Sequence, residues 1–248
     1  MQLSELNDYI GRLLDVSRFR DYCPNGLQVE GRAEIKRIAT GVTATQRLLE
    51  AATAWGADAI LVHHGYFWRN EDATVTGIKK RRIAHLLRHD MSLLAYHLPL
   101  DAHAELGNNA QLAQLLGWLP QGRFGEQDIG WFGELHLPQT LKQFAENIAQ
   151  ALQRAPQVIG NGEKKISRIA WCSGAAQNYF EQAVALGVDA YLTGEISEQN
   201  VHVAQETGVA FIAAGHHATE RYGVKALGEH LAQQFDIEHR FFDMDNPV

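Results

Sequence analysis

Apolar and polar positions follow a strand–helix–strand pattern that occurs twice along the chain. Residues 35–64 begin with a short apolar run, pass a turn of small residues, continue with helical periodicity, reach Gly-x-Asp-Ala and end in a second apolar run. Residues 166–195 repeat this order at an offset of 131, without a gap and with 13 of 30 positions identical. A helix between two strands makes the strands parallel neighbours through a right-handed crossover. The pattern therefore predicts two related α/β units.

A weaker correspondence follows each copy of the repeat. An apolar strand ends at a histidine, His97 in the first half and His216 in the second. Four residues later comes an acid, Asp101 or Glu220, and a helical pattern follows each acid. The two halves therefore continue to resemble one another beyond the repeat itself.

The predicted fold is α/β, with two similar half-domains related by the internal repeat. Residues 1–120 form the first half-domain and residues 155–248 the second. Residues 121–154 form a variable connecting segment, which we expect to add an antiparallel piece. We also expect a dinuclear metal site between the half-domains, because potential metal ligands fall at the ends of the predicted strands.

Distinctive polar residues fall at the carboxyl ends of the predicted strands. His63 and His64 close the strand AILV, and Glu195 takes the place of His64 in the second copy of the repeat. Two further strands end at His97 and His216. Ligands collect at the carboxyl ends of parallel strands, so these side chains converge if the half-domains face one another. The candidate metal ligands are His63, His64, Asp101, His216 and Glu220.

Imidazole and carboxylate groups without thiolate suit iron, zinc or manganese. Five such ligands exceed the three typical of one catalytic zinc and suit two divalent ions per chain, bridged by a carboxylate and a water. Where the strand ends, His63 and His64 can each take one ion. His97 and Glu195 are the candidate catalytic residues, as proton-transfer groups, with Glu195 also a candidate to support a ligand.

Other histidines and basic residues have simpler interpretations. His85 and His89 have helical spacing, but basic neighbours indicate a solvated face. Residues 79–82 are four basic residues in a row, expected to be solvated or to make a local phosphate contact. Cys23 and Cys172 form no CxxC pair, and neither has the base and orienting residue that a nucleophilic cysteine needs. The histidines expected to be structural or on the surface are His103, His136, His202, His230 and His239.

Charge and hydropathy exclude several classes of protein. The formal net charge is -7, from 29 acidic and 22 basic residues, which disfavours general nucleic-acid binding. No apolar run approaches the roughly 20 residues that span a bilayer, so no membrane contact is expected. The first residues carry acids and lack the features of a secretory signal, which predicts a cytoplasmic protein.

The motifs around these residues resemble those of a known family. They are DYCPNGLQVEG, VHHGYFW, YHLPLDAHAELGNNAQLA, TGEISEQ and AGHHATERYGVKAL. In this order they are similar to the motifs of the Nif-three-like family, whose members are GTP cyclohydrolase type two homologues, in its short bacterial form. The resemblance implies a dinuclear site in which His63 and Asp101 bind one metal, His64 and His216 bind the other, and Glu220 bridges them. It also implies a homo-hexameric ring, a toroid of stacked trimers. Leu98 stands where the family often has threonine.

Two functions follow as hypotheses. The first is a dinuclear metal-dependent hydrolase that acts on nucleotides or damaged nucleotides through a metal-bridging water. The alternative is a non-catalytic metal-binding ring that binds a protein or nucleic-acid partner. Turnover of a nucleotide that disappears when metal is removed distinguishes the two.

Overall fold

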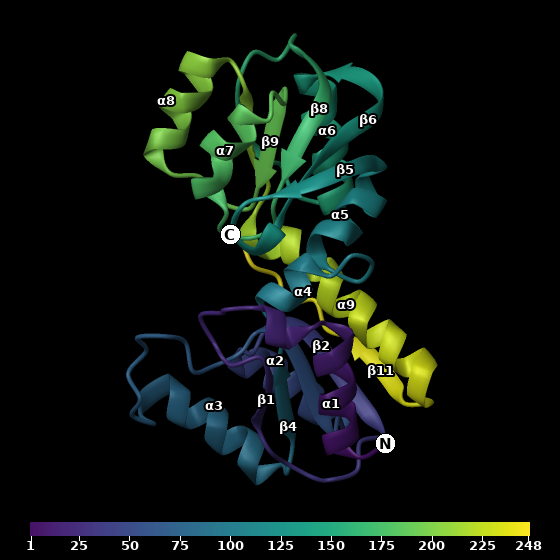
Figure 1. Ribbon diagram of the computed structural model, residues 1–248. Coiled ribbons are helices and arrows are strands. Elements are labelled where there is room, and N and C mark those ends of the chain that lie inside the picture. The colour runs from purple at the N-terminus through teal and green to yellow at the C-terminus, as the bar shows by residue number, and fades with distance from the viewer. The chain divides into compact units, whose positions relative to one another are not determined.

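The computed structural model describes residues 1–248, which form two compact units (Figure 1). The first unit contains residues 1–107 and 223–245, and the second contains residues 108–222 and 246–248. Each unit is built around its own β-sheet. This confirms the predicted α/β class with two half-domains. None of the helices combines the length and the apolar character needed to cross a membrane.

The first unit has a five-stranded sheet in the order β1-β4-β3-β2-β11. β1 is antiparallel to β4, and the other four strands are parallel to one another. Its elements are α1 (Leu3–Leu13), η1 (Val16–Arg18), β1 (Gly26–Val29), β2 (Arg37–Thr43), α2 (Gln46–Trp55), β3 (Ala59–His64), α3 (Gly77–Arg88), β4 (Ser92–Ala95), α4 (Leu98–Ala102), β11 (Glu238–Phe241) and α9 (His216–Phe235) from Gly223 onward.

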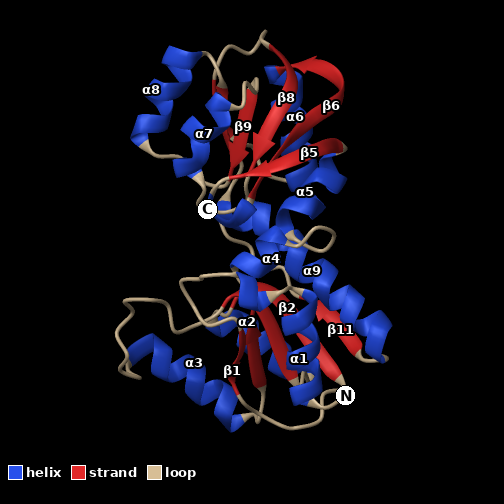
Figure 2. Cartoon of the chain, in the orientation of Figure 1, coloured by secondary structure: helices blue, strands red, loops and turns tan.

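Helices cover both faces of this first sheet (Figure 2). Leu61 and Leu94 belong to one core cluster with the apolar residues of α1 and α9. Ile60 and Leu93, one position earlier in the same strands, belong to another cluster with α2 and α3. Successive side chains of a strand point to opposite faces, so strands buried on both faces are apolar throughout. The polar residues of these strands are therefore concentrated at their ends.

The second unit has a six-stranded sheet in the order β5-β6-β8-β9-β10-β7. β8, β9 and β10 are parallel, and the neighbours on both sides are antiparallel. Its elements are α5 (Asn108–Leu116), β5 (Trp118–Phe124), η2 (Glu126–Asp128), β6 (Gly130–Thr140), α6 (Leu141–Leu152), β7 (Gln157–Ile159), β8 (Lys165–Trp171), η3 (Gln177–Tyr179), α7 (Phe180–Ala185), β9 (Ala190–Thr193), α8 (Glu198–Thr207), β10 (Ala210–Ala213) and the first residues of α9.

The sequence repeat has the same strand register in both units. Ile38 of β2 lies opposite Ala59 of β3, and Ile169 of β8 lies opposite Ala190 of β9. Both partners of the second pair are displaced from the first by the 131 residues of the sequence offset. The strand–helix–strand prediction is confirmed in both copies, with the two strands parallel.

The aspartate of each Gly-x-Asp-Ala motif explains part of the repeat. Asp58 Oδ2 accepts hydrogen bonds from the backbone N–H groups of Lys36 and Arg37, both 2.8 Å long. Asp189 Oδ2 accepts the equivalent two from residues 167–168, both 2.9 Å long. Each carboxylate thus connects one parallel strand to the start of its neighbour. It also accepts hydrogen bonds from backbone N–H groups that no other strand pairs with.

The unit boundaries differ from the predicted ones. Residues 121–154 lie wholly within the second unit, where β6 pairs with β8 in the antiparallel arrangement expected of this segment. Residues 223–245 belong to the first unit, because β11 pairs in parallel with β2. Pairing between strands so distant along the chain leaves no local signal in the sequence, so periodicity does not indicate that β11 joins the sheet of the first unit.

Candidate metal centre

Three histidines gather at one edge of the first sheet. His63 and His64 end β3, and His97 lies between β4 and α4. Their ring centroids are 4.6 Å apart for His63 and His64, 5.1 Å for His63 and His97, and 5.7 Å for His64 and His97. One ring nitrogen from each lies within 4.8 Å of the other two. The cluster forms because β3 and β4 are parallel neighbours and end at the same edge.

The hydrogen bonds of two of these histidines orient their rings. His63 Nδ1 lies 3.0 Å from the carbonyl oxygen of Tyr96, which can only accept, so Nδ1 carries the proton and Nε2 carries the lone pair. His64 Nδ1 lies 3.2 Å from the hydroxyl of Thr43. Outer contacts of this kind fix the ring orientation of metal-binding histidines. The donor set therefore fits a transition-metal ion.

Asp21 is a functional candidate that sequence reasoning missed. Its Oδ1 lies 2.7 Å from His97 Nδ1, and its Oδ2 accepts from Asn25 Nδ2 at 2.8 Å and from the N–H of Leu98 at 2.9 Å. Burial alone would raise the pKa of this carboxyl, but the hydrogen bonds and charge of His97 and Asn25 lower it. Asp21 stands in the motif DYCPNGLQVEG, which follows no predicted parallel strand, so its position along the chain does not mark it as part of a site.

Cys23 lies beside this pair. Asp21, Cys23 and His97 form a second group whose potential ligand atoms lie within 4.8 Å of one another. Burial, together with the negative charge of Asp21, raises the pKa of the Cys23 thiol to about 12. The thiolate is the form that binds metal, so Cys23 is a poorer ligand than the histidines.

Asp101 completes the polar cluster of the first unit. Its side chain is buried, and Oδ2 lies 3.5 Å from His63 Nε2. It lies inside the short helix α4, which begins directly after His97, and it precedes α5 as the sequence pattern predicted. Asp101 is therefore held by a short helix against the end of β3.

The second unit places its candidates at the start of α9. His216 and Glu220 lie one helical turn apart, which brings them to one face, and His216 Nε2 lies 3.2 Å from Glu220 Oε2. The sequence pattern predicted that Glu220 precedes this helix, but α9 begins at His216. Glu220 is buried, with 3% of its side chain exposed. Residues 216–220 therefore form one turn of α9 and not a loop before it.

Glu195 holds the other side of the His216 ring. Its Oε1 lies 2.6 Å from His216 Nδ1. Burial alone would lower the pKa of His216, but the hydrogen bonds and charges of Glu220 and Glu195 outweigh it and raise the pKa to about 9. Glu195 thus has the position of a carboxylate that orients a metal-binding histidine.

Backbone contacts fix this second cluster. Gly194 donates its N–H to the carbonyl oxygen of Gly174 at 2.8 Å, and Gly215 donates to that of Gly194 at 3.0 Å. Gly174 has φ 67°, and a Cβ added there would overlap Glu220 Oε1 and lie 3.3 Å from His216 Nε2. Only a residue without a side chain leaves room here for the Glu220 carboxylate and the His216 ring. Gly174 is therefore a second candidate site residue that sequence reasoning missed.

The remaining histidines serve structural roles or lie on the surface. Both ring nitrogens of His85 have partners on α2, Gln46 at 3.3 Å and Thr53 at 2.8 Å. His230 lies 2.7 Å from the Tyr9 hydroxyl. Three others have contacts or positions away from the clusters: His103, His202 and His239.

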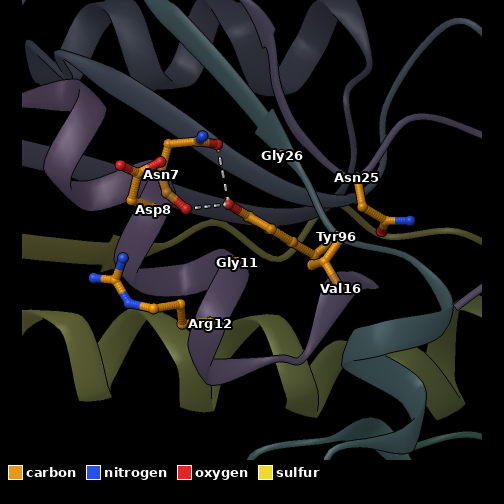
Figure 3. A pocket seen from close by; sticks show the side chains of 8 residues that line it. All are labelled: Asn7, Asp8, Gly11, Arg12, Val16, Asn25, Gly26 and Tyr96. Carbon is orange, nitrogen blue, oxygen red and sulfur yellow. Dashed lines mark hydrogen bonds between the residues drawn. The ribbon is translucent and has the colours of Figure 1, made fainter. Parts of the chain in front are cut away.

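The first unit has a polar pocket of about 300 Å³ (Figure 3). Asp8 and Arg12 line it from α1, and the Tyr96 side chain lines it with its hydroxyl directed at Asn7. Tyr96 also supplies the carbonyl oxygen that orients His63, so the pocket and the histidine cluster share a residue. Pockets of this size suit small ligands held by a few convergent polar groups.

These features define an α/β protein of two repeated units, each with histidine and carboxylate side chains at the carboxyl ends of its parallel strands. Several of these side chains form groups that could hold a metal ion. The chain belongs to the Duf34/NIF3 (NGG1p interacting factor 3) family, whose model matches residues 1–247.

Similar proteins agree with this membership. A "GTP cyclohydrolase 1 type 2 homolog" of Pseudomonas aeruginosa is 55% identical over 249 residues, covering 99% of this chain and 98% of that protein. The solved structure of "protein ybgI, unknown function" has 46% identity and a TM-score of 0.97 over 100% of both chains. The crystal structure of TTHA1606 from Thermus thermophilus has 32% identity and a TM-score of 0.92, again over 100% of both chains.

Proposed function

We propose that the protein is a metal-dependent hydrolase that binds two divalent ions and acts on nucleotides or damaged nucleotides. The observation that supports it most is that histidine and carboxylate side chains lie at the carboxyl ends of parallel strands in both units, and that several of them form groups that could hold a metal ion. The proposed ligands are His63, His64 and Asp101 from the first unit with His216 and Glu220 from the second. Iron, zinc and manganese suit this mixture of imidazole and carboxylate.

Bound divalent ions would lower the pKa of a water molecule and polarise the phosphoryl or ring C–N bond under attack. The chain's own residues supply orientation and proton transfer. Glu195 is a candidate to move a proton, because its carboxylate is hydrogen-bonded to His216 Nδ1 at 2.6 Å. The imidazole of His97 is a candidate for proton transfer and also for metal binding.

The nucleotide class is supported by two observations. The relatives at 50–57% identity carry a name that refers to GTP. The pocket lined by Tyr96 offers a carboxylate, a guanidinium and an amide, from Asp8, Arg12 and Asn7. These groups match the donors and acceptors of a nucleobase.

The proposal is tested with metal-free protein reconstituted with iron(II), zinc or manganese(II) and screened against nucleoside triphosphates and their oxidised or deaminated forms. We expect up to two metals per chain by elemental analysis, and hydrolysis that is lost on chelation and restored by metal. Asp101→Ala is expected to lower the metal content. If the fully loaded protein hydrolyses none of these compounds, the alternative of a non-catalytic metal-binding ring takes its place.

The pocket gives a prediction about substrate binding. Asp8→Ala and Arg12→Ala are each expected to raise KM about tenfold, equivalent to about 1.4 kcal/mol, with little change in kcat, because a contact to a non-reacting part of the substrate stabilises ground and transition states equally. The measurement is steady-state kinetics. Glu5→Ala is the control, since Glu5 is an exposed acid on the same helix outside the pocket. An unchanged KM in both pocket variants would place the substrate elsewhere.

We also propose that the chain assembles into a hexameric ring. A duplicated unit places equivalent surfaces on two parts of one protomer, which suits closed assemblies. Light scattering at micromolar concentration is expected to give about six times the chain mass of 27.6 kDa. A mass near that of one chain would contradict the ring.

A further inference from the structure

The helix α3 carries a concentration of positive charge that the rest of the protein does not share. Residues 79–88 include five lysines and arginines and no acid, although the net charge of the protein is -7. Three of these cations are exposed and form no hydrogen bond or ion pair within the protein: Lys80, Arg81 and Arg88. Their charge is therefore available to a bound anion.

The three cations line one pocket of the first unit, which α2 and α3 form together and which has a volume of about 530 Å³. The α3 residues that line it recur every three or four positions, which puts them on one face of the helix: Gly77, Lys80, Arg81, Ala84 and Arg88. The two small residues keep this face open, and nothing lies within 4 Å of a Cβ added to Gly77. Cations thus border a cavity that no large side chain fills.

The α2 side of the pocket supplies Gln46 and Glu50. Gln46 Nε2 donates to Glu50 Oε1 at 3.0 Å and to His85 Nδ1 at 3.3 Å. An amide nitrogen can only donate, so His85 Nδ1 accepts and the ring is neutral. Burial, and then the charge of His89, lowers the pKa of His85 in agreement with this. Gln46 Oε1 remains buried without a hydrogen-bond partner, an unfavourable state that a donor on a bound molecule would relieve.

The pocket therefore combines three cations, a single carboxylate and an acceptor without a donor. We propose that it binds a phosphorylated small molecule that also carries a hydroxyl group. Lys80, Arg81 and Arg88 contact the phosphate through charge-assisted hydrogen bonds. The hydroxyl of the ligand donates to Gln46 Oε1. None of the lining residues is a candidate metal ligand, so this site is separate from the one proposed for hydrolysis.

The dimensions of the site favour a small molecule over nucleic acid. Pockets for small ligands have volumes of roughly 300–1,000 Å³, and this one lies within that range. Lys80 and Arg88 are eight residues apart, or about 12 Å along the helix. Nucleic acid needs basic residues over a longer surface, and the net charge of -7 opposes it elsewhere on the protein.

The test is equilibrium dialysis of the metal-free full chain against ribose 5-phosphate, inorganic phosphate and ribose. Metal is removed so that phosphate cannot bind through an ion at the candidate metal ligands. We expect one ribose 5-phosphate per chain, bound more tightly than phosphate, and no binding of ribose. Arg81→Gln and Arg88→Gln are each expected to weaken ribose 5-phosphate binding at least tenfold. Arg47→Gln is the matched control, because Arg47 is an exposed arginine of α2 outside the pocket.

Two further variants leave the charge unchanged. Ala84→Met places a larger side chain on the open face without loss of helix propensity, and we expect at least tenfold weaker binding with unchanged thermal unfolding. Gln46→Met removes the acceptor, and we expect the affinity for ribose 5-phosphate to fall to that for phosphate.

Several results would each overturn the inference. They are no binding of ribose 5-phosphate, binding equal to that of phosphate in the wild type, and the same loss in Arg47→Gln as in Arg81→Gln. Unchanged binding in Ala84→Met would also place the ligand elsewhere. A single-stranded oligonucleotide that displaces ribose 5-phosphate at lower concentration would make this face a nucleic-acid surface instead. No hydrolysis is measured, so the outcome does not depend on the proposed function.

Discussion

Glu220→Gln is expected to reduce hydrolysis on the order of 10³-fold while the protein stays folded. In the proposed site Glu220 would help to hold the cations through its negative charge, and a neutral amide cannot replace that charge. A loss of several kcal/mol of transition-state stabilisation corresponds to a rate change of this order. Steady-state rates and metal content measured on the same sample, with circular dichroism for the fold, are the required data.

The matched control for this variant lies on the same helix. Glu229→Gln changes an exposed carboxylate of α9 that makes only a 3.9 Å contact with Lys225, and we expect wild-type turnover. Glu195→Ala is expected to lower the rate partially, about 10- to 100-fold, as removal of a group that orients a metal-binding histidine does. Full activity in a metal-depleted Glu220→Gln protein would mean that the hydrolysis comes from another site.

Gly174→Ala is expected to weaken metal binding at the second cluster about 10- to 100-fold, although alanine has no functional group. The added Cβ would overlap Glu220 Oε1 and lie 3.3 Å from His216 Nε2, so the buried carboxylate must shift and the geometry of the pair must change. The expected data are a reduced metal content and a weaker binding constant by dialysis. Turnover should fall in proportion to the loss of bound metal.

Gly117→Ala separates this steric effect from backbone strain. Gly117 has φ 66° against 67° for Gly174, but nothing lies within 4 Å of a Cβ added there. Both variants therefore carry the same penalty of about 1–2 kcal/mol for a left-handed alanine. We expect Gly117→Ala to lower stability alone. Equal metal binding in the two variants would remove Gly174 from the site.

The sequence indicated the repeated part of the fold because the repeat is local. Within residues 35–64 and residues 166–195, apolar periodicity and the glycine that ends each helix indicate a strand, a helix and a second strand over about 30 residues. The structure shows the two copies with matching register and parallel strands. Because parallel strands end at a common edge, the pattern of residues alone predicts that the histidines of the first unit gather there.

The helix boundaries at the site were less predictable. The sequence placed Glu220 before a helix, and the structure places it inside α9. Asp101 precedes α5 as predicted, but it also lies inside the short helix α4, which the sequence pattern did not predict. His97 and His216 both follow an apolar strand pattern, so the sequence does not show that His216 already belongs to a helix. Only the backbone conformation after Gly215 distinguishes them, and it puts His216 and Glu220 on one helical face.

The sequence by itself determined the α/β class, the duplication and the residue types at the strand ends, since these follow from local periodicity and side-chain chemistry. Only the tertiary structure decided which distant residues complete the clusters. Asp21 meets His97 across 76 residues, and Gly174 matters through the space beside Glu220. Contacts of this kind depend on how separate elements pack, and packing is set by long-range burial and strand pairing that no short window of sequence contains.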